Sequence, residues 1–266
     1  MLDSYGRQID YLRVSVTDRC NLRCRYCMPN EGVPLLKHSD ILSFEEITEV
    51  VRTAVEMGVT KVRLTGGEPL VRRGIVNLVE LIAGINGVQD LAMTTNGILL
   101  SQYAKDLFSA GLGRVNVSLD TTDAACYHRL TCGGDIEDVF SGIEAALEAG
   151  LRPIKLNCVV GSYSAPSNVQ AVQAYGRRNG LDVRVIRQMT FSTGCFSVVH
   201  GGTGGDCKRC NRIRLSSDGK VRPCLFSDLF FDIRQLGPFE AIRQAVDTKP
   251  EAGRPCGHTA MQTIGG

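Results

Sequence analysis

The chain has 266 residues, of which 43% are hydrophobic, so it can bury one large core or two small ones. The formal net charge is +2, which gives no bulk reason to expect binding to nucleic acid or to an anionic membrane. The first residues are polar and no apolar run could cross a bilayer, so we expect no signal peptide and no membrane span. Eleven cysteines in such a chain indicate a reducing, cytoplasmic setting, where clustered cysteines are more often metal ligands than disulfides.

Strand-like and helix-like patterns alternate along most of the chain. Strands are expected at residues 11–16, 61–65, 90–94, 114–119, 154–160 and 182–188, and helices at residues 43–58, 74–85, 101–111, 135–150 and 167–180. Ser43 is the expected N-cap of the first helix, and Glu46 completes a capping box. The series predicts an α/β fold with a parallel sheet and outer helices, either an open partial barrel or a doubly wound sheet.

Three polar loops directly follow expected strands. They are CNLRCRYC at residues 20–27, GGEPL at residues 66–70 and TTNG at residues 94–97. Because loops at the carboxyl ends of parallel strands carry the chemistry in both folds, we expect these loops to share one rim. After about residue 189 the pattern gives way to glycine- and cysteine-rich sequence. We therefore expect two units, residues 1–189 and a C-terminal extension of residues 190–266.

The first of these loops carries three cysteines, Cys20, Cys24 and Cys27, in the spacing C-x3-C-x2-C. Three neighbouring thiolates suit a soft metal centre. A structural zinc site usually takes four protein ligands, whereas an iron–sulfur cube held by three cysteines leaves one iron open to a small molecule. The spacing therefore favours an iron–sulfur cluster, with zinc and free thiols as the alternatives.

Two motifs together resemble the signature of the radical S-adenosylmethionine superfamily: the C-x3-C-x2-C loop with Tyr26 before its last cysteine, and TGGEP at residues 65–69. The resemblance implies a 4Fe–4S cluster on the three cysteines, whose open iron chelates S-adenosylmethionine. It also implies that one electron cleaves the sulfonium to a 5′-deoxyadenosyl radical, which abstracts hydrogen from a substrate. The fold expected for such a member is a partial (β/α)6 barrel of the TIM type with a C-terminal iron–sulfur extension.

Two longer stretches, residues 13–29 and residues 206–226, are similar to the GTP 3′,8-cyclase family of molybdenum cofactor biosynthesis. The second stretch holds Cys207, Cys210 and Cys224 in the spacing C-x2-C-x13-C. The similarity implies a second 4Fe–4S cluster with an open iron, a small-molecule substrate in GTP, a flavodoxin- or ferredoxin-type reductant and a homodimer. A zinc ribbon remains the alternative for this segment taken alone.

The family's site residues carry over onto matching positions of this chain. For the cofactor they are Tyr26, Gly67, Glu68, Ser118 and Met189, and for the substrate Arg13, Arg63, Thr94, Lys155, Arg184, Arg212 and Arg214. Arg212 and Arg214 join the first three cysteines in the expected catalytic set, and the terminal Gly265 and Gly266 match a tail that reaches the active site. The plain readings are that strand cations pair with carboxylates or water, that Thr94 and Ser118 satisfy turns, and that Met189 fills the core.

This sequence also departs from the family. A segment is missing between Met189 and Cys207, and Arg187 stands where the family has an acidic residue, so we expect a positive charge beside the substrate cavity. Cys195 and Cys256 have no family role, and either could be a fourth ligand of the second cluster. The competing hypotheses are a radical enzyme of the same architecture acting on another nucleotide or a peptide, and a non-catalytic iron–sulfur sensor or electron carrier.

Overall fold

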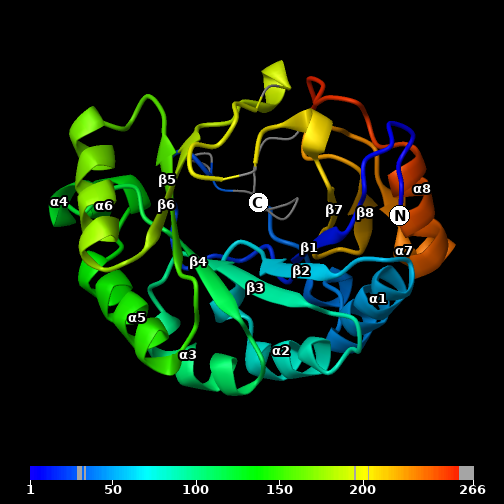
Figure 1. Ribbon diagram of the computed structural model, residues 1–266, viewed down its shortest axis with the longest axis horizontal. Coiled ribbons are helices and arrows are strands. Elements are labelled where there is room, and N and C mark those ends of the chain that lie inside the picture. The colour runs from blue at the N-terminus through cyan, green and yellow to red at the C-terminus, as the bar shows by residue number, and fades with distance from the viewer. Residues whose placement is uncertain (29–31, 33, 195, 203, 258–266) are drawn as a thin grey trace.

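The computed structural model describes residues 1–28, 32, 34–194, 196–202 and 204–257. The described strands form one sheet in the order β6-β5-β4-β3-β2-β1-β7-β8-β9, which curves into an open barrel (Figure 1). The strands are β1 Tyr11–Ser15, β2 Lys61–Thr65, β3 Asp90–Thr95, β4 Arg114–Ser118, β5 Lys155–Val160, β6 Asp182–Arg187, β7 Arg212–Leu215, β8 Lys220–Arg222 and β9 Phe231–Asp232. Neighbours from β6 to β7 pair in parallel, whereas β8 and β9 add antiparallel pairs.

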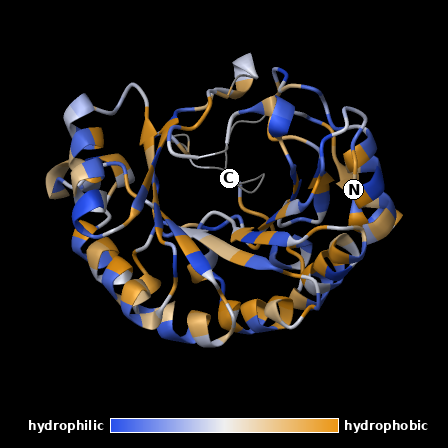
Figure 2. Cartoon of the chain, viewed as in Figure 1, coloured by the Kyte–Doolittle hydropathy of each residue, from blue (hydrophilic) through white to orange (hydrophobic). Residues whose placement is uncertain are grey.

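Helices line the outer side of the sheet (Figure 1). They are α1 Phe44–Glu56, α2 Ile75–Ala83, α3 Leu100–Ser109, α4 Ala124–Thr131, α5 Ile136–Ala149, α6 Pro166–Arg178, α7 Ile233–Leu236 and α8 Pro238–Asp247. The expected capping box at Ser43 and Glu46 is confirmed, with both reciprocal hydrogen bonds formed. Figure 2 shows hydrophilic and hydrophobic residues on these helices, as amphipathic outer helices require. Within the described residues, none of the helices has the length and apolar character to cross a membrane.

The apolar core lies between the sheet and the helices, and the inner face of the barrel is polar. Along β1, Leu12 and Val14 are fully buried in the core, and they alternate with Tyr11 and Arg13 on the other face. The same alternation sets Val62 and Leu64 of β2 against the inward-facing Arg63, whose guanidinium lies over the Tyr11 ring. A parallel barrel with a polar inner face is built to hold a polar ligand.

The sequence predicted the six-stranded part of the sheet well and the C-terminal segment less well. The six predicted strands are confirmed, and their consecutive order identifies a partial barrel, since a doubly wound sheet reverses its strand order. The helix α4 was not predicted, and neither were β7–β9, α7 and α8. Within residues 190–266, β7 pairs in parallel with β1, so this segment extends the barrel sheet on its free side. The division into units 1–189 and 190–266 stays a prediction.

The segment after β6 crosses the open side of the barrel toward β7 (Figure 1). His200 pairs with Val185 of β6 through two backbone hydrogen bonds of 3.1 and 3.2 Å, which covers that sheet edge. Earlier in this segment, Phe191 and Phe196 pack against Phe226, which follows the second cysteine set. The segment after β6 thus contacts both β6 and the loop after β8. It does so although it lacks the longer stretch that the resemblance to the family leads us to expect between Met189 and Cys207. Cys195 lies outside the described residues.

The expectation that Arg187 places its charge beside the substrate cavity was wrong. Side chains alternate along a strand, and Arg187 has the opposite parity to the inward-facing Arg184 of β6. Val183, which shares the parity of Arg187, packs against Gly176 of α6 on the helix side. Arg187 is exposed, so its charge faces solvent outside the barrel.

Candidate active site

The GGEP turn after β2 is packed onto the start of the first cysteine loop. The amide of Gly67 donates to the Thr17 carbonyl at 2.8 Å, and the amide of Glu68 donates to the Arg19 carbonyl at 2.8 Å. A Cβ on Gly67 would lie 2.3 Å from the Arg19 carbonyl oxygen. Only glycine allows the two backbones to approach so closely, so this turn fixes the loop that carries the cysteines.

Glu68 joins this turn to the loop after β3. Its buried carboxylate accepts hydrogen bonds from the Leu70 amide at 3.0 Å, the Thr95 hydroxyl at 2.7 Å and the Asn96 amide at 2.6 Å. Burial raises the pKa of Glu68 to about 7 despite these bonds. The Asn96 side chain in turn donates to Asn21 at 2.8 Å, so GGEP, TTNG and the cysteine loop share one rim, as predicted.

The first three cysteines are half-buried at this rim. Burial raises the pKa of Cys20, raises that of Cys24 further, and raises that of Cys27 to about 11. In the described residues no three His, Cys, Asp or Glu side chains are grouped closely enough to hold one metal ion. Ligands of a single zinc lie about 2.3 Å from it, whereas the cysteines of a cube each bind a different iron. The all-thiol donor set suits the cube.

A buried carboxylate that the sequence did not flag lies behind these cysteines. Asp120, just after β4, accepts from the Val159 amide at 2.7 Å, and it interacts with the hydroxyl of Tyr26. Burial raises the pKa of Asp120 to about 6, opposed by both partners. The hydroxyl of Tyr127 on α4 is buried with no hydrogen-bond partner among the described residues. These groups make the surroundings of the first site acidic and polar.

The second set of cysteines lies where β7 begins and β8 ends. Cys207 opens a 3-10 turn, the amide of Cys210 donates to the Cys207 carbonyl at 3.2 Å, and Cys224 accepts from the Phe226 amide at 3.4 Å. Burial by itself raises the pKa of Cys210, but the charges of Lys249 and Arg212 and hydrogen bonds outweigh it, so that pKa is lowered. The surroundings of this site are therefore cationic.

Four arginines occupy neighbouring inward positions across β2, β1, β7 and β8. Arg63 is opposite Arg13, Arg13 is opposite Arg214, and Arg214 is opposite Arg222. Like charges directly opposite in a sheet destabilise it. Burial lowers the pKa of Arg63 and that of Arg214 to about 10 each. Arg222 was missed by the sequence analysis, although its place two residues before Cys224 could have indicated it.

Several inward donors have no partner within the described part of the chain. They include Nε of Arg63, Nε of Arg184 and the hydroxyl of Thr94. With its amide oxygen turned inward, Asn116 of β4 accepts from Nη1 of Arg63 at 2.9 Å and from Nη1 of Arg184 at 3.2 Å. Neither arginine forms an ion pair with a described carboxylate. Cations that no described carboxylate balances favour the binding of an anionic ligand.

Other predicted residues are placed less decisively. Lys155 forms an ion pair with Asp182 at 3.5 Å, so part of its charge is already balanced. Met189 packs against the small apolar cluster of Leu225 and Phe226 beside Cys224. Ser118 ends β4 half-buried at the rim. The roles predicted for these residues stay predictions, and Gly265 and Gly266 lie outside the described residues.

A cavity of about 570 Å³ opens at the other end of the barrel, where β1, β2 and β7 begin. Its lining includes Arg7, Lys61 and Asp10. Lys61 is paired with Asp10 at 2.8 Å, and Arg7 with Asp3 at 2.6 Å. Two of its lining cations are thus balanced, whereas Arg63 and Arg184 on the inner face have no ion pair with a described carboxylate.

The family model of the radical SAM superfamily matches residues 14–170, a range that contains the first cysteine loop and the GGEP turn. The chain belongs to the radical SAM superfamily. It therefore uses a 4Fe–4S cluster and S-adenosylmethionine, and the three-thiol loop described above fits that cluster.

Curated relatives narrow the family. The chain is 40% identical over 324 residues to "GTP 3′,8-cyclase" of Thermodesulfovibrio yellowstonii and 42% identical over 323 residues to that of Moorella thermoacetica; both alignments cover 100% of each chain. It is 41% identical over 277 residues to the Peptoclostridium acidaminophilum protein of the same name, covering 88% of this chain and 85% of the relative. This radical SAM enzyme thus belongs with the GTP 3′,8-cyclase family.

Solved structures agree on the fold. Streptococcus suis SuiB bound to S-adenosylmethionine aligns with a TM-score of 0.68 at 15% identity, covering 91% of this chain and 64% of that chain. SuiB bound to the precursor peptide SuiA aligns with a TM-score of 0.72 at 14% identity, covering 98% of this chain and 70% of that chain. At such identities the likeness establishes the partial barrel and nothing finer.

Proposed function

We propose that this radical SAM enzyme is a GTP 3′,8-cyclase, which converts GTP to (8S)-3′,8-cyclo-7,8-dihydroguanosine 5′-triphosphate for molybdenum cofactor biosynthesis. The observation that carries the proposal is the row of inward arginines on β2, β1, β7 and β8. The proposal is also supported by relatives that are about 40% identical over their full length and share the name GTP 3′,8-cyclase. A triphosphate supplies several negative charges, and guanidinium groups pair bidentately with phosphate oxygens.

The chain's own residues have distinct tasks in this proposal. Arg63 and Arg184, which share the Asn116 amide, bind phosphate oxygens through donors that the protein leaves open. Arg212 and Arg214 act from β7, and Thr94 donates from the end of β3 toward the nucleotide. Each charge-assisted hydrogen bond is worth about 1.5–3 kcal/mol, so together they hold the ribose in one orientation and exclude water.

The first cysteine loop holds the cofactor in this proposal. A reduced cluster with S-adenosylmethionine bound there would supply a 5′-deoxyadenosyl radical to take hydrogen from the ribose 3′ carbon. Bonding of that carbon to guanine C8 would then need one electron from the reductant and one proton to give the 7,8-dihydro product. Gly67 leaves backbone room beside the loop, and Glu68 holds GGEP against TTNG through its three hydrogen bonds. Tyr26, held against Asp120, borders the adenine, and Ser118 lies on the ribose side.

We also propose a second 4Fe–4S cluster on Cys207, Cys210 and Cys224, with an open iron that faces the guanine. The support is a three-thiol donor set beside two cations, the half-buried Arg212 and the buried Lys249. A flavodoxin- or ferredoxin-type protein would deliver the electron. Cytoplasmic location and a homodimer complete the proposal.

One contact favours a second candidate, a radical enzyme with a closed second cluster that acts on another nucleotide or a peptide. Cys256 packs into the same small apolar cluster as Cys224, around Leu225 and Phe226. A fourth thiolate there would close the open iron. Cys256→Ala separates the two: an open cluster keeps about eight irons per chain and its spectrum, whereas a closed one loses iron or changes its spectrum.

The deciding experiment incubates reconstituted protein anaerobically with S-adenosylmethionine, dithionite and GTP, followed by mass spectrometry of the products. We expect 5′-deoxyadenosine and the cyclised triphosphate together. Calorimetry of the protein with both clusters intact should detect GTP binding that weakens tenfold to a hundredfold in Arg212→Ala. The absence of saturable GTP binding at millimolar concentration would reject the cyclase assignment and leave the radical SAM assignment intact.

A further inference from the structure

Lys249, just after α8, is a buried cation that reaches two separate segments of the second cysteine site. Its side chain is almost fully buried, with the residue 3% exposed. The ammonium Nζ donates to the Arg212 carbonyl at 2.7 Å and to the Pro223 carbonyl at 2.7 Å. Arg212 comes two residues after Cys210, and Pro223 immediately precedes Cys224. One ammonium group thus ties together the two backbone segments that carry these cysteines.

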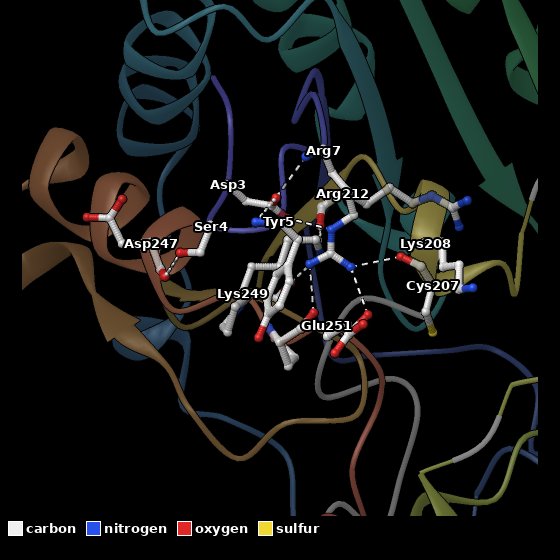
Figure 3. A network of polar contacts seen from close by, with 12 residues as sticks. Asp3, Ser4, Tyr5, Arg7, Cys207, Lys208, Arg212, Asp247, Lys249 and Glu251 are labelled. Atoms are coloured by element: carbon white, nitrogen blue, oxygen red, sulfur yellow. Dashed lines mark hydrogen bonds and ion pairs between the residues drawn. The ribbon is translucent and has the colours of Figure 1, made fainter.

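The residues that follow Lys249 are fixed from the other side by Arg7. The guanidinium of Arg7 donates to the carbonyls of Pro250 at 2.7 Å, Glu251 at 2.9 Å and Cys207 at 2.8 Å (Figure 3). Asp3 balances the charge of Arg7 through an ion pair of 2.6 Å. The charge of Arg7 is therefore balanced by Asp3. Its hydrogen bonds connect Cys207, the remaining cysteine of the second set, to the backbone that follows Lys249.

The charge of Lys249 is balanced differently. Within the described residues Lys249 forms no ion pair with a carboxylate. Two of its acceptors are neutral carbonyls, and its side chain also forms a hydrogen bond with the side chain of Cys210. A buried ammonium without a counterion costs several kcal/mol. The acidic groups that interact with it are the thiols of Cys210 and Cys224. Cysteine binds a metal as the thiolate, so a cluster held by Cys210 and Cys224 would bring negative charge beside this ammonium.

We propose that Lys249 is a positioning residue of the second cluster: it sets the spacing of Cys210 and Cys224 and supplies the positive charge that offsets their thiolates. The inference rests on the proposed second cluster. A nearby cation stabilises the cluster most after the cluster has gained an electron, because reduction adds negative charge. Lys249 therefore raises the reduction potential of the second cluster, and its two hydrogen bonds raise the occupancy of that site.

The test measures iron content and the potentials of both clusters, by anaerobic redox titration followed by electron paramagnetic resonance, without GTP. Lys249→Met should lose iron at the second site, and the cluster that remains should be reduced at a more negative potential. Lys249→Gln keeps a donor for the carbonyls but no charge, so it should retain more iron than Lys249→Met and show the same negative shift. Lys249→Arg should restore the potential toward that of the unmodified protein.

The matched control is Lys208→Met, since Lys208 is exposed and directly follows Cys207. Its charge is screened by solvent, so neither iron content nor potential should change. In every variant, formation of 5′-deoxyadenosine without GTP reports that the barrel and the first cluster are intact. If Lys249→Met and Lys249→Gln both keep two clusters and an unchanged reduction potential of the second cluster, the proposed role of Lys249 is wrong, while the second cluster itself stands. An unmodified protein with a single cube would overturn the second cluster, and this inference with it, while cyclase activity is a separate measurement.

Discussion

The two cysteine sites have the same three-thiol donor set and opposite electrostatic surroundings. Around the first site the buried charged groups are carboxylates, Glu68 and Asp120, and burial raises the pKa of all three thiols. Around the second site they are cations, Lys249 and Arg214, and the pKa of Cys210 is lowered. The same donor set therefore lies in two opposite electrostatic environments.

The difference follows the charge of what each site would hold. S-adenosylmethionine carries a sulfonium and an ammonium, so carboxylates behind the first loop favour its binding. The second site borders the row of arginines that we assign to a triphosphate, and cations there favour an anion. Opposite fields at the two ends of one polar barrel would orient a cationic cofactor and an anionic substrate toward each other.

The largest expected effect separates the two sites outright. Cys24→Ala should abolish 5′-deoxyadenosine formation, because the first cluster loses one of its three ligands. Cys210→Ala should leave cleavage of S-adenosylmethionine measurable while removing GTP cyclisation. Each variant should lose up to about four irons per chain. Chromatography of the nucleosides and iron analysis check both outcomes.

The two sites would not differ in function if Cys24→Ala and Cys210→Ala had the same effect. Undiminished cleavage of S-adenosylmethionine in Cys24→Ala would remove the first loop from the chemistry. A zinc content near one per chain, with iron for a single cube, would turn the second site into a zinc ribbon.

The next effect concerns the buried carboxylate at the first site. The pKa of Glu68 is raised from 4.5 to about 7, so between these values the folded protein keeps a proton that the unfolded chain has lost. Stability of the cluster-free protein should therefore fall as the pH rises through this window, by about 3 kcal/mol for this group at most. Glu68→Gln should remove that part of the slope.

Urea unfolding of both proteins at pH 5 and pH 7.5 measures the difference in slope. Asp120, whose pKa is also raised, is present in both proteins, so its contribution cancels in the comparison. Equal slopes in the two proteins would show that Glu68 is ionised across the whole range and that the acidic field at the first site is already present at pH 5.

The barrel could be predicted from the sequence because its signals are local. Alternating strand patterns and the capping box of Ser43 and Glu46 need only neighbouring residues, and each was confirmed. The placement of β7 beside β1 could not be predicted, because that pairing joins residues about 200 positions apart without a sequence signal. The charge on Arg187 was misplaced because a substitution was considered without the strand's alternation.

The site divides in the same way. Cys20, Cys24 and Cys27 lie in one loop, so their spacing predicted them together. Arg222, Asn116 and Lys249 join the site only through pairing across the sheet or through burial after α8. Asp120 follows an ordinary strand, and its acidity matters only because folding buries it behind Tyr26.

A smaller effect tests the inner face of the barrel against the outer one on a single strand. Arg184→Met removes an inward cation and should weaken GTP binding about tenfold to a hundredfold, the range for one charge-assisted hydrogen bond. Arg187→Met is the matched control, because it removes the same charge three residues away on the outer face. Calorimetry should find its affinity unchanged. Equal losses in both variants would mean that net charge, and not the inward row, attracts the nucleotide.

The smallest effect compares two ways of joining the C-terminal segment to the barrel. Lys249 joins it inside, through buried hydrogen bonds, whereas Arg234 of α7 joins it outside, through an ion pair of 3.0 Å with Glu46 of α1. The side chains of Arg234 and Glu46 are 39% and 35% exposed, so solvent and salt screen their attraction. Arg234→Ala should cost about 0.2–1 kcal/mol in unfolding free energy, and Glu46 keeps its capping bond to Ser43. Urea unfolding in 0 and 1 M salt checks this, and the loss should shrink in high salt while the iron content and both cluster potentials stay unchanged. A change in the second potential would show that the outer joint also positions the second cluster.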